Sequence, residues 1–137
     1  MRTQFKRDIQ SISSVFEFAK SFVQQNQLDS QTAFSLDLIL EEIFSNILKY
    51  NKGGKAEIGI ELCLDNNILM IQIIDECSNP FDFSEAGSYD SSASLEKRPI
   101  GKLGLHLVKT LTDQISSDYQ TGFSKLTIKK KLKELHV

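Results

Sequence analysis

Two polar side chains stand four residues apart in a segment with strong helical periodicity. Glu42 and Asn46 therefore project from the same face of a helix, and Lys49 continues that face by almost another turn. An Asn carbonyl oxygen is a suitable ligand for Mg²⁺, which usually keeps several waters and takes further oxygens from phosphate groups. A neighbouring carboxylate can accept the proton of an attacking hydroxyl. The same spacing is also common on a solvated helix face, so the pair alone leaves both interpretations open.

A third candidate, Asp75, follows an apolar run over residues 68–74 that is typical of a strand. A carboxylate at the end of a strand can accept a hydrogen bond from an exocyclic amine, such as that of adenine. The alternative is a turn-forming aspartate, which is the commoner use of this residue where a strand ends.

A segment with two glycines, Gly101 to Leu105, opens a further helical pattern over residues 103–111. Glycines there let backbone amides approach a phosphate, and the N-terminus of a helix favours an anion. Lys102 could add a contact to the phosphate. The spacing is not that of a Walker P-loop, and an ordinary turn before a helix is the alternative.

Two helices are expected to position the first pair, over residues 11–25 and 32–50, because apolar residues recur at helical spacing in both. Asp29 or Ser30 is available as the N-cap of the second helix. The apolar stripe of that helix is expected to face the core and contains Leu36, Ile39, Leu40, Ile43 and Ile47.

Strands are expected where apolar residues alternate or run together. The apolar run before Asp75 predicts a central strand covered on both faces. The Lys-rich end, residues 125–133, predicts a solvated edge strand. Consecutive hairpins then predict a largely antiparallel sheet with the helices layered on one face, an α+β two-layer sandwich. The expected strands cover residues 3–9, 56–64, 68–74, 115–120 and 125–132, with turns at 65–67 and 121–122.

The long polar stretch between two of these strands, residues 75–99, is expected to be a lid. Within it, residues 85–95 are expected to be mobile when no nucleotide is bound, because they are polar and lack apolar anchors.

The composition narrows the class of protein. With 137 residues, 40% hydrophobic and 25% charged, the chain is expected to be one globular domain over residues 1–137. A net charge of −2 argues against a general nucleic-acid binder. No apolar run approaches the roughly 20 residues that a membrane span needs. Cys63 and Cys77 lack metal-ligand spacing. No signal peptide is visible at the polar N-terminus, so a cytoplasmic protein with both thiols reduced is expected.

Four segments, taken in order, resemble the motifs of one family. LEEIFSNILKY (40–50) resembles the N-box of the GHKL (histidine-kinase-like) ATPase superfamily, and IIDECSNPFDF (73–83) resembles its first glycine box. LEKRPIGKLGLHLVKTLTD (95–113) resembles the lid end and second glycine box of one branch, the RsbW-like anti-sigma-factor serine kinases and their ATP-binding relatives. SKLTIKKKL (124–132) resembles the last strand of that branch, so the resemblance covers roughly residues 5–132.

This resemblance implies a Bergerat-type fold, a mostly antiparallel sheet with three main helices on one face, and ATP bound between helices and sheet under a mobile lid. By position, Glu42 matches the catalytic base, Asn46 the Mg²⁺ ligand and Asp75 the carboxylate that reads adenine. The resemblance assigns the remaining nucleotide contacts to Lys49, Arg98, Gly101, Lys102, Leu103, Gly104, Leu105 and Thr127.

Among those contacts, Arg98 is the phosphate contact from the lid. The turn around Gly101 and Gly104 matches the phosphate-binding turn of the family. Thr127 matches a threonine on the last strand that lies near the adenine.

The activity implied by the resemblance is ATP-dependent phosphorylation of a protein serine. Active members of the branch phosphorylate a small STAS-domain anti-anti-sigma factor, many also sequester a sigma factor, and members are often dimers. Three residues depart from the family pattern: Cys77 and Lys102 replace glycines and Lys49 replaces a histidine. Because these departures bear on phosphoryl transfer, the alternative is a non-catalytic nucleotide-binding module that interacts with a protein partner.

Overall fold

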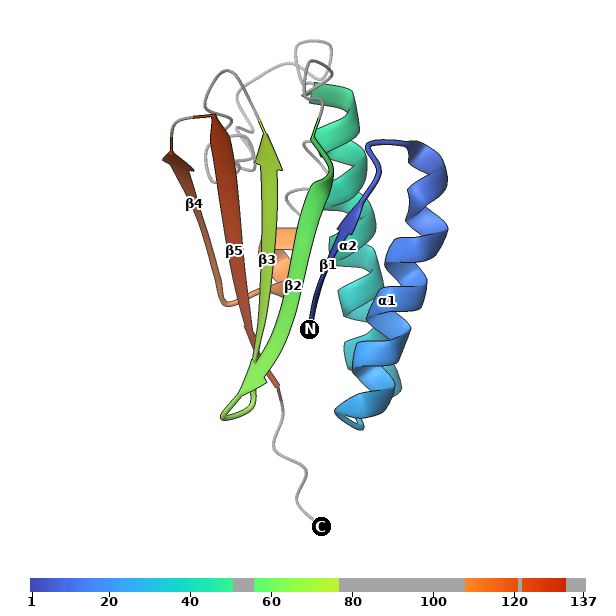
Figure 1. Cartoon of the computed structure of the whole chain (residues 1–137). Helices are drawn as coiled ribbons and strands as arrows, with labels where there is room; N and C mark the ends of the chain where they lie inside the picture. Colours follow the sequence, from blue (N-terminus) through green and yellow to red (C-terminus); the bar gives the residue numbers. More distant parts are fainter. Residues whose placement is uncertain (51–55, 77–107, 121, 133–137) are drawn as a thin grey trace, which may run out of the picture.

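The chain forms a five-stranded antiparallel sheet with its helices packed against one face (Figure 1). The computed structural model describes residues 1–50, 56–76, 108–120 and 122–132. The strand order is β1-β2-β3-β5-β4. The elements are β1 (Arg2–Phe5), the 3₁₀ turn η1 (Ile9–Ser11), α1 (Ile12–Gln25), α2 (Ser30–Tyr50), β2 (Ile58–Asp65), β3 (Ile68–Glu76), a short helical segment (108–111), β4 (Gln114–Gln120) and β5 (Phe123–Lys131).

The two long helices begin and end close to where their periodicity predicts. Asp29 caps α2, since its Oδ1 accepts a hydrogen bond from the backbone N–H of Thr32 at 2.7 Å. The predicted apolar stripe of α2 is confirmed, because every member is at most 2% exposed. Together with Phe44, this stripe packs α2 against the sheet, which fixes the orientation of the helix about its own axis.

The hairpin between β2 and β3 is closed by the predicted asparagine turn. Asp65 pairs with Ile68, which leaves Asn66 and Asn67 as a two-residue loop. Both have positive φ, 49° and 63°, the conformation that a tight hairpin loop needs and that Asn tolerates.

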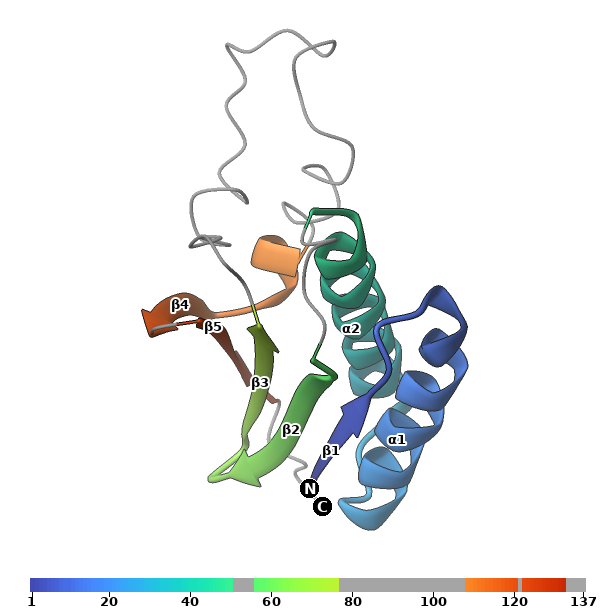
Figure 2. The same ribbon diagram turned by 45° about the horizontal axis from the view of Figure 1, so that its top comes forward.

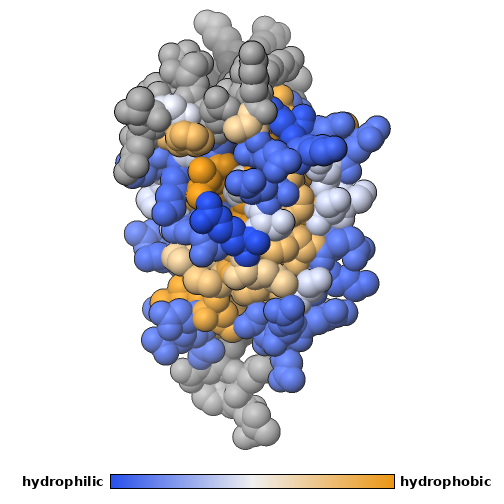
Figure 3. Space-filling model, viewed as in Figure 1, coloured by the Kyte–Doolittle hydropathy of each residue, from blue (hydrophilic) through white to orange (hydrophobic). Residues whose placement is uncertain are grey.

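The central strand is β3, but only one of its faces is fully covered. Leu69, Ile71 and Ile73 are buried beneath the helices, whereas Met70 and Gln72 on the other face are half-buried. The prediction of a strand covered on both faces is therefore wrong. Figure 2 shows the reason, because α1 and α2 lie on the same side of the sheet. The outer face shows hydrophobic side chains beside hydrophilic ones (Figure 3).

The Lys-rich strand is also not at the edge. β5 pairs with β3 on one side and β4 on the other, so β4 is the edge strand. Lys125, Lys129 and Lys131 point to the open face and are exposed there, while Leu126 and Ile128 are buried. The lysines solvate one face of an internal strand rather than protecting an edge.

β1 is short but firmly attached. Phe5 pairs with Ile58 of β2, and its ring contacts Phe18 and Phe44 edge to face at centroid distances of 5.7 and 6.5 Å. These contacts join the first strand to both long helices, and they fix the position of the chain just before Arg7.

No helix in the described ranges is long and apolar enough to cross a membrane. The predicted lid beyond Glu76, the stretch 85–95, and most of the helix predicted over 103–111 lie outside the described residues.

Candidate functional site

Asn46 is buried on α2 and holds one hydrogen bond within its own helix. Its Nδ2 donates to the backbone carbonyl of Glu42 at 2.5 Å, and the residue is only 2% exposed. Because a carbonyl can only accept, the amide nitrogen must face it, and Oδ1 is turned the other way. Within the described part of the chain, Oδ1 is buried and has no hydrogen-bond partner.

A buried acceptor without a partner costs about 1–3 kcal/mol, so it requires an explanation. The amide of Asn46 supplies the kind of oxygen that Mg²⁺ binds. No group of three or more His, Cys, Asp or Glu side chains suited to a metal occurs among the described residues. The residues therefore fit an ion that takes one protein oxygen and completes its shell with phosphate oxygens and water, as Mg²⁺ does.

Glu42 and Lys49 lie one turn on either side of Asn46 but in different surroundings. Glu42 is half-buried. Lys49 is exposed and lines a shallow hollow with Arg7, Ser45 and other residues near the start of α1. Asp75 does not line this hollow.

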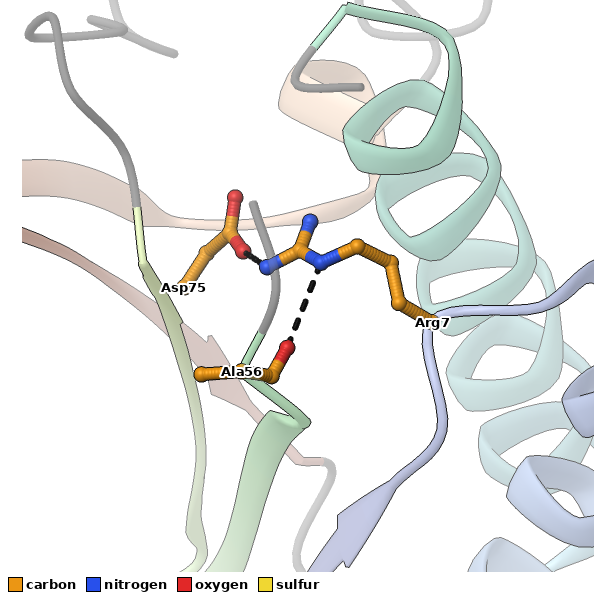
Figure 4. Close-up of polar contacts among 3 residues, drawn as sticks. All are labelled: Arg7, Ala56 and Asp75. Carbon is orange, nitrogen blue, oxygen red and sulfur yellow. Dashed lines mark hydrogen bonds and ion pairs between the residues drawn. The ribbon is translucent and has the colours of Figure 1, made fainter. Parts of the chain in front are cut away.

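Asp75 occupies the second-last position of β3 and is paired with a residue from the other end of the sequence. Its Oδ1 forms an ion pair with Nη2 of Arg7 (Figure 4). Nε of the same guanidinium donates to the carbonyl of Ala56 at 3.2 Å. Asp75 is 4% exposed, so this is a buried carboxylate and not a surface turn residue. The sequence gives no local signal for Arg7, because 68 residues separate it from its partner.

Ser124 lies directly opposite Asp75 in the β3–β5 pairing. It is 4% exposed, and within the described residues its Oγ is buried without a hydrogen-bond partner. Side chains opposite each other point to the same face, here the face under the helices. A carboxylate acceptor thus lies beside a hydroxyl that can donate or accept, a combination suited to the polar edge of an aminopurine.

Thr127, in contrast, is not brought to this place. It pairs with Gln72 and Ser116 and points to the open face of the sheet. The sequence pattern indicates this orientation: Leu126 and Ile128 are buried, and Thr127 between them must point to the opposite face of the strand. Ser124 is the residue of β5 that shares the face of Asp75.

The two groups of buried polar side chains are at the same end of the molecule. β3 and α2 end on the same side of the sheet–helix layer, and the helical segment 108–111 lies about half-way down the layer, behind the sheet (Figure 1). Nζ of Lys130 donates to the carbonyl of Leu111 at 2.7 Å and so attaches the end of that segment to β5. Arg98 and the turn 101–105, with Gly101, Lys102, Leu103, Gly104 and Leu105, lie outside the described residues, as does Cys77.

Known proteins share both the sequence pattern and the fold. The family model of the histidine kinase-like ATPase domain matches residues 5–130. The serine-protein kinase RsbW of Bacillus cereus is 33% identical over 99 residues, which are 69% of this chain and 61% of that protein. RsbW of Listeria monocytogenes is 30% identical over 95 residues, covering 65% and 60%. The chain thus spans about three fifths of the length of these relatives.

Solved structures agree on the fold. A chain in the crystal structure of the SiaB-SiaC complex from Pseudomonas aeruginosa has a TM-score of 0.66 at 10% identity, covering 94% of this chain and 88% of that one. The histidine kinase AdeS of Acinetobacter baumannii has a TM-score of 0.54 at 14% identity, covering 98% and 68%. The sequence match over residues 5–130 and the shared fold show that the chain belongs to the histidine kinase-like ATPase domain family.

Proposed function

We propose that this chain binds Mg·ATP between α2 and the sheet and transfers the γ-phosphoryl group to a serine of a protein partner. The observation that carries the proposal is a pair of buried polar atoms without partners among the described residues. They are Asn46 Oδ1, close to the end of α2, and Ser124 Oγ, opposite Asp75 close to the end of β3. These two elements end on the same side of the layer (Figure 1). Bound nucleotide and its cation would satisfy both atoms at once. Family membership and the RsbW relatives support this assignment.

In the proposed mechanism each residue has one task. Asp75 accepts from the exocyclic amine of adenine, and Ser124 donates to the neighbouring ring nitrogen. Asn46 would hold Mg²⁺, which when bound would neutralise charge on the phosphates. Glu42 accepts the proton of the serine hydroxyl as that oxygen attacks the γ-phosphorus. The bond from the γ-phosphorus to the bridging oxygen breaks at the same time, and ADP leaves with the electron pair. Most of the catalysis is then positioning and electrostatics.

The phosphates would be held by residues of the second glycine box. We propose that the turn 101–105 supplies backbone donors, that Lys102 and Arg98 add charge, and that Lys49 lies at the margin of the site. The helical segment 108–111, which follows that turn in the sequence, is attached to β5 through Lys130.

The partner we propose is a small STAS-domain anti-anti-sigma factor in a cytoplasmic partner-switching system. RsbW relatives are named serine-protein kinases, and the SiaB-SiaC structure is a two-protein complex that contains this fold. On the basis of the similarity to RsbW, we also propose a sigma factor and a second copy of the chain as partners.

Calorimetric titration with Mg·ATP tests the binding half. We expect saturable binding by the wild type and a large loss in Asp75→Asn, with Asp65→Asn, an exposed aspartate of β2, as the matched control. Circular dichroism must first show that the variants are folded. Absence of binding by the folded wild type would sink the proposal.

Incubation with the cognate STAS protein and labelled ATP tests the catalytic half. Label should reach the substrate serine with wild type and with Glu41→Gln, an exposed neighbour, but about 100-fold more slowly with Glu42→Gln, since general-base catalysis contributes roughly 10²–10⁴-fold. If ATP binds but label never reaches the substrate, the chain is a non-catalytic nucleotide-binding interaction module. The glycine-box departures at Cys77 and Lys102 are the features that favour this second function.

A further inference from the structure

Arg7 joins three separate segments at the point where the base would bind. It belongs to the loop after β1, its Nε donates to Ala56 just before β2, and its Nη2 pairs with Asp75 near the end of β3 (Figure 4). We propose that Arg7 is a positioning residue that makes Asp75 selective for a 6-aminopurine over a 6-oxopurine. This inference rests on the nucleotide site proposed above and adds a residue that the motifs do not contain.

The guanidinium is held at two points and is almost buried. The Arg7 side chain is 11% exposed and that of Asp75 is 6% exposed. The Nε contact to Ala56 measures 3.2 Å, and it fixes the plane of the guanidinium while Nη2 engages the carboxylate. A planar fork with two anchors has little rotational freedom, which distinguishes this contact from an exposed ion pair.

The backbone on both sides of Arg7 is anchored as well. Two residues earlier, Phe5 packs edge to face on Phe18 and Phe44 and pairs with Ile58. One residue later, Asp8 caps η1, since its Oδ1 accepts from the backbone N–H of Gln10 at 3.0 Å. The fold therefore fixes the backbone position of Arg7, and from that position its side chain reaches Asp75.

The pairing decides what Asp75 can recognise. A guanidinium only donates, so Oδ1 of Asp75 is an acceptor engaged by Arg7. The other oxygen lies on the side of the carboxylate away from Arg7 (Figure 4). A carboxylate that is paired with a guanidinium can still accept a hydrogen bond from an exocyclic amine. The carbonyl oxygen of a 6-oxopurine is itself an acceptor, so it would face the carboxylate without forming a hydrogen bond. Mispairing at a charged buried acceptor lowers affinity by about 10- to 100-fold.

Binding of Mg·ATP and Mg·ITP, which differ at the purine C6 substituent, tests the role of Arg7 by calorimetry. We expect wild type to prefer ATP by about tenfold or more, as a charged hydrogen bond allows. Arg7→Met keeps most of the side-chain volume but removes the donors, and it should lose about tenfold in ATP affinity while ITP affinity changes less than about threefold. Arg2→Met, an exposed arginine on β1, is the matched control and should leave both affinities unchanged.

Each outcome bears on the inference. Equal loss for both nucleotides in Arg7→Met would show a merely structural role, and tighter ATP binding would show that Arg7 obstructs the base; either overturns the proposal. Arg7→Lys keeps the charge but cannot make both contacts, so an intermediate ATP-to-ITP ratio is expected even if Arg7→Met fails to fold. If the wild type binds neither nucleotide, the proposed nucleotide site itself is wrong. If a folded Arg7 variant keeps the wild-type selectivity, only the inference about Arg7 is wrong.

Discussion

Asp75 and Ser124 are directly opposite each other across β3 and β5, and both side chains lie on the face that the helices cover. One is a carboxylate paired with Arg7, and the other is a buried hydroxyl without a partner in the described part of the chain. The pairing register alone brings them together. Because the Ser124 hydroxyl has no partner among the described residues, replacing Ser124 gives a test that separates binding from folding.

Replacing Ser124 by alanine should weaken nucleotide binding without weakening the fold. The hydroxyl forms no hydrogen bond among the described residues, so its removal should leave the unfolding free energy unchanged or raise it by up to about 1 kcal/mol. Affinity for Mg·ATP should fall about 3- to 10-fold, the value of one hydrogen bond. Thermal unfolding with and without nucleotide measures both effects, and Ser116→Ala, exposed on β4, is the control. A destabilised variant with intact affinity would contradict the assignment.

Replacing Asn46 by alanine should reduce affinity for the Mg²⁺ complex and leave metal-free ATP almost unaffected. We expect a loss of about tenfold or more for Mg·ATP, in the range found when metal-site residues are changed. Asn26 offers a closely matched control, since its Nδ2 also donates to the backbone carbonyl four residues earlier, that of Phe22, at 2.9 Å. Asn26→Ala should not change the magnesium dependence. Titrations in Mg²⁺ and in EDTA make the comparison, and equal losses in both would exclude a ligand role.

The two described glycines should respond differently to alanine. Gly122 has φ of +84°, so a side chain there is strained although nothing lies within 4 Å of the added Cβ. We expect Gly122→Ala to cost about 1 kcal/mol. Gly59 is in β2, where an added Cβ would make an ordinary contact with Ile74 at 3.8 Å. Gly59→Ala should be neutral or stabilise by less than about 1 kcal/mol in chemical denaturation. If Gly59→Ala destabilised the protein more than Gly122→Ala, the positive φ at Gly122 would not be a source of strain.

Asp37 should make the stability depend on pH in an unusual direction for an aspartate. Burial, and then repulsion from Glu41, raises the pKa of Asp37 above its ordinary value of 3.8. The folded protein therefore holds this proton more tightly than the unfolded chain. Stability contributed by the protonated group is fully present below pH 3.8 and is lost as the pH rises through the raised value.

Asp37→Asn should consequently raise the melting temperature at neutral pH and lose this advantage below the ordinary pKa. Glu41→Gln removes only the second cause and should give a smaller gain. Glu17→Gln, exposed on α1, should have no comparable effect. Melting curves recorded from neutral pH to below the ordinary pKa of Asp37 test this prediction. If the stabilisation by Asp37→Asn increases toward acid pH, the prediction is wrong.

The features that the sequence predicted well are local ones. The spacing of Glu42 and Asn46 fixes their common helix face, and the apolar stripe of α2 fixes which way that face turns. The asparagines at 66 and 67 determine the hairpin loop, because few other residues accept two positive φ angles in succession. These conclusions need only residues a few positions apart.

The features that the sequence did not predict depend on pairing between distant segments. The apolar run of β3 was expected to be covered on both faces, but Met70 lies half-exposed because the helices occupy one side only. The resemblance to the family motif points to Thr127, whereas the register of β5 with β3 brings Ser124 opposite Asp75. Arg7 could not be identified at all, since its role depends on a contact over 68 residues.

The order of pairing in the sheet also has a kinetic consequence. β2–β3 and β4–β5 are hairpins between neighbours in the sequence, and each can form early. Pairing of β3 with β5 joins segments about fifty residues apart and must overcome the larger loop-closure entropy. We therefore expect the contact between the hairpins to form late, and Asp75 meets Ser124 only in that contact. A chain halted before this step would contain most of its secondary structure but would lack the Asp75–Ser124 pair on which the proposed nucleotide site depends.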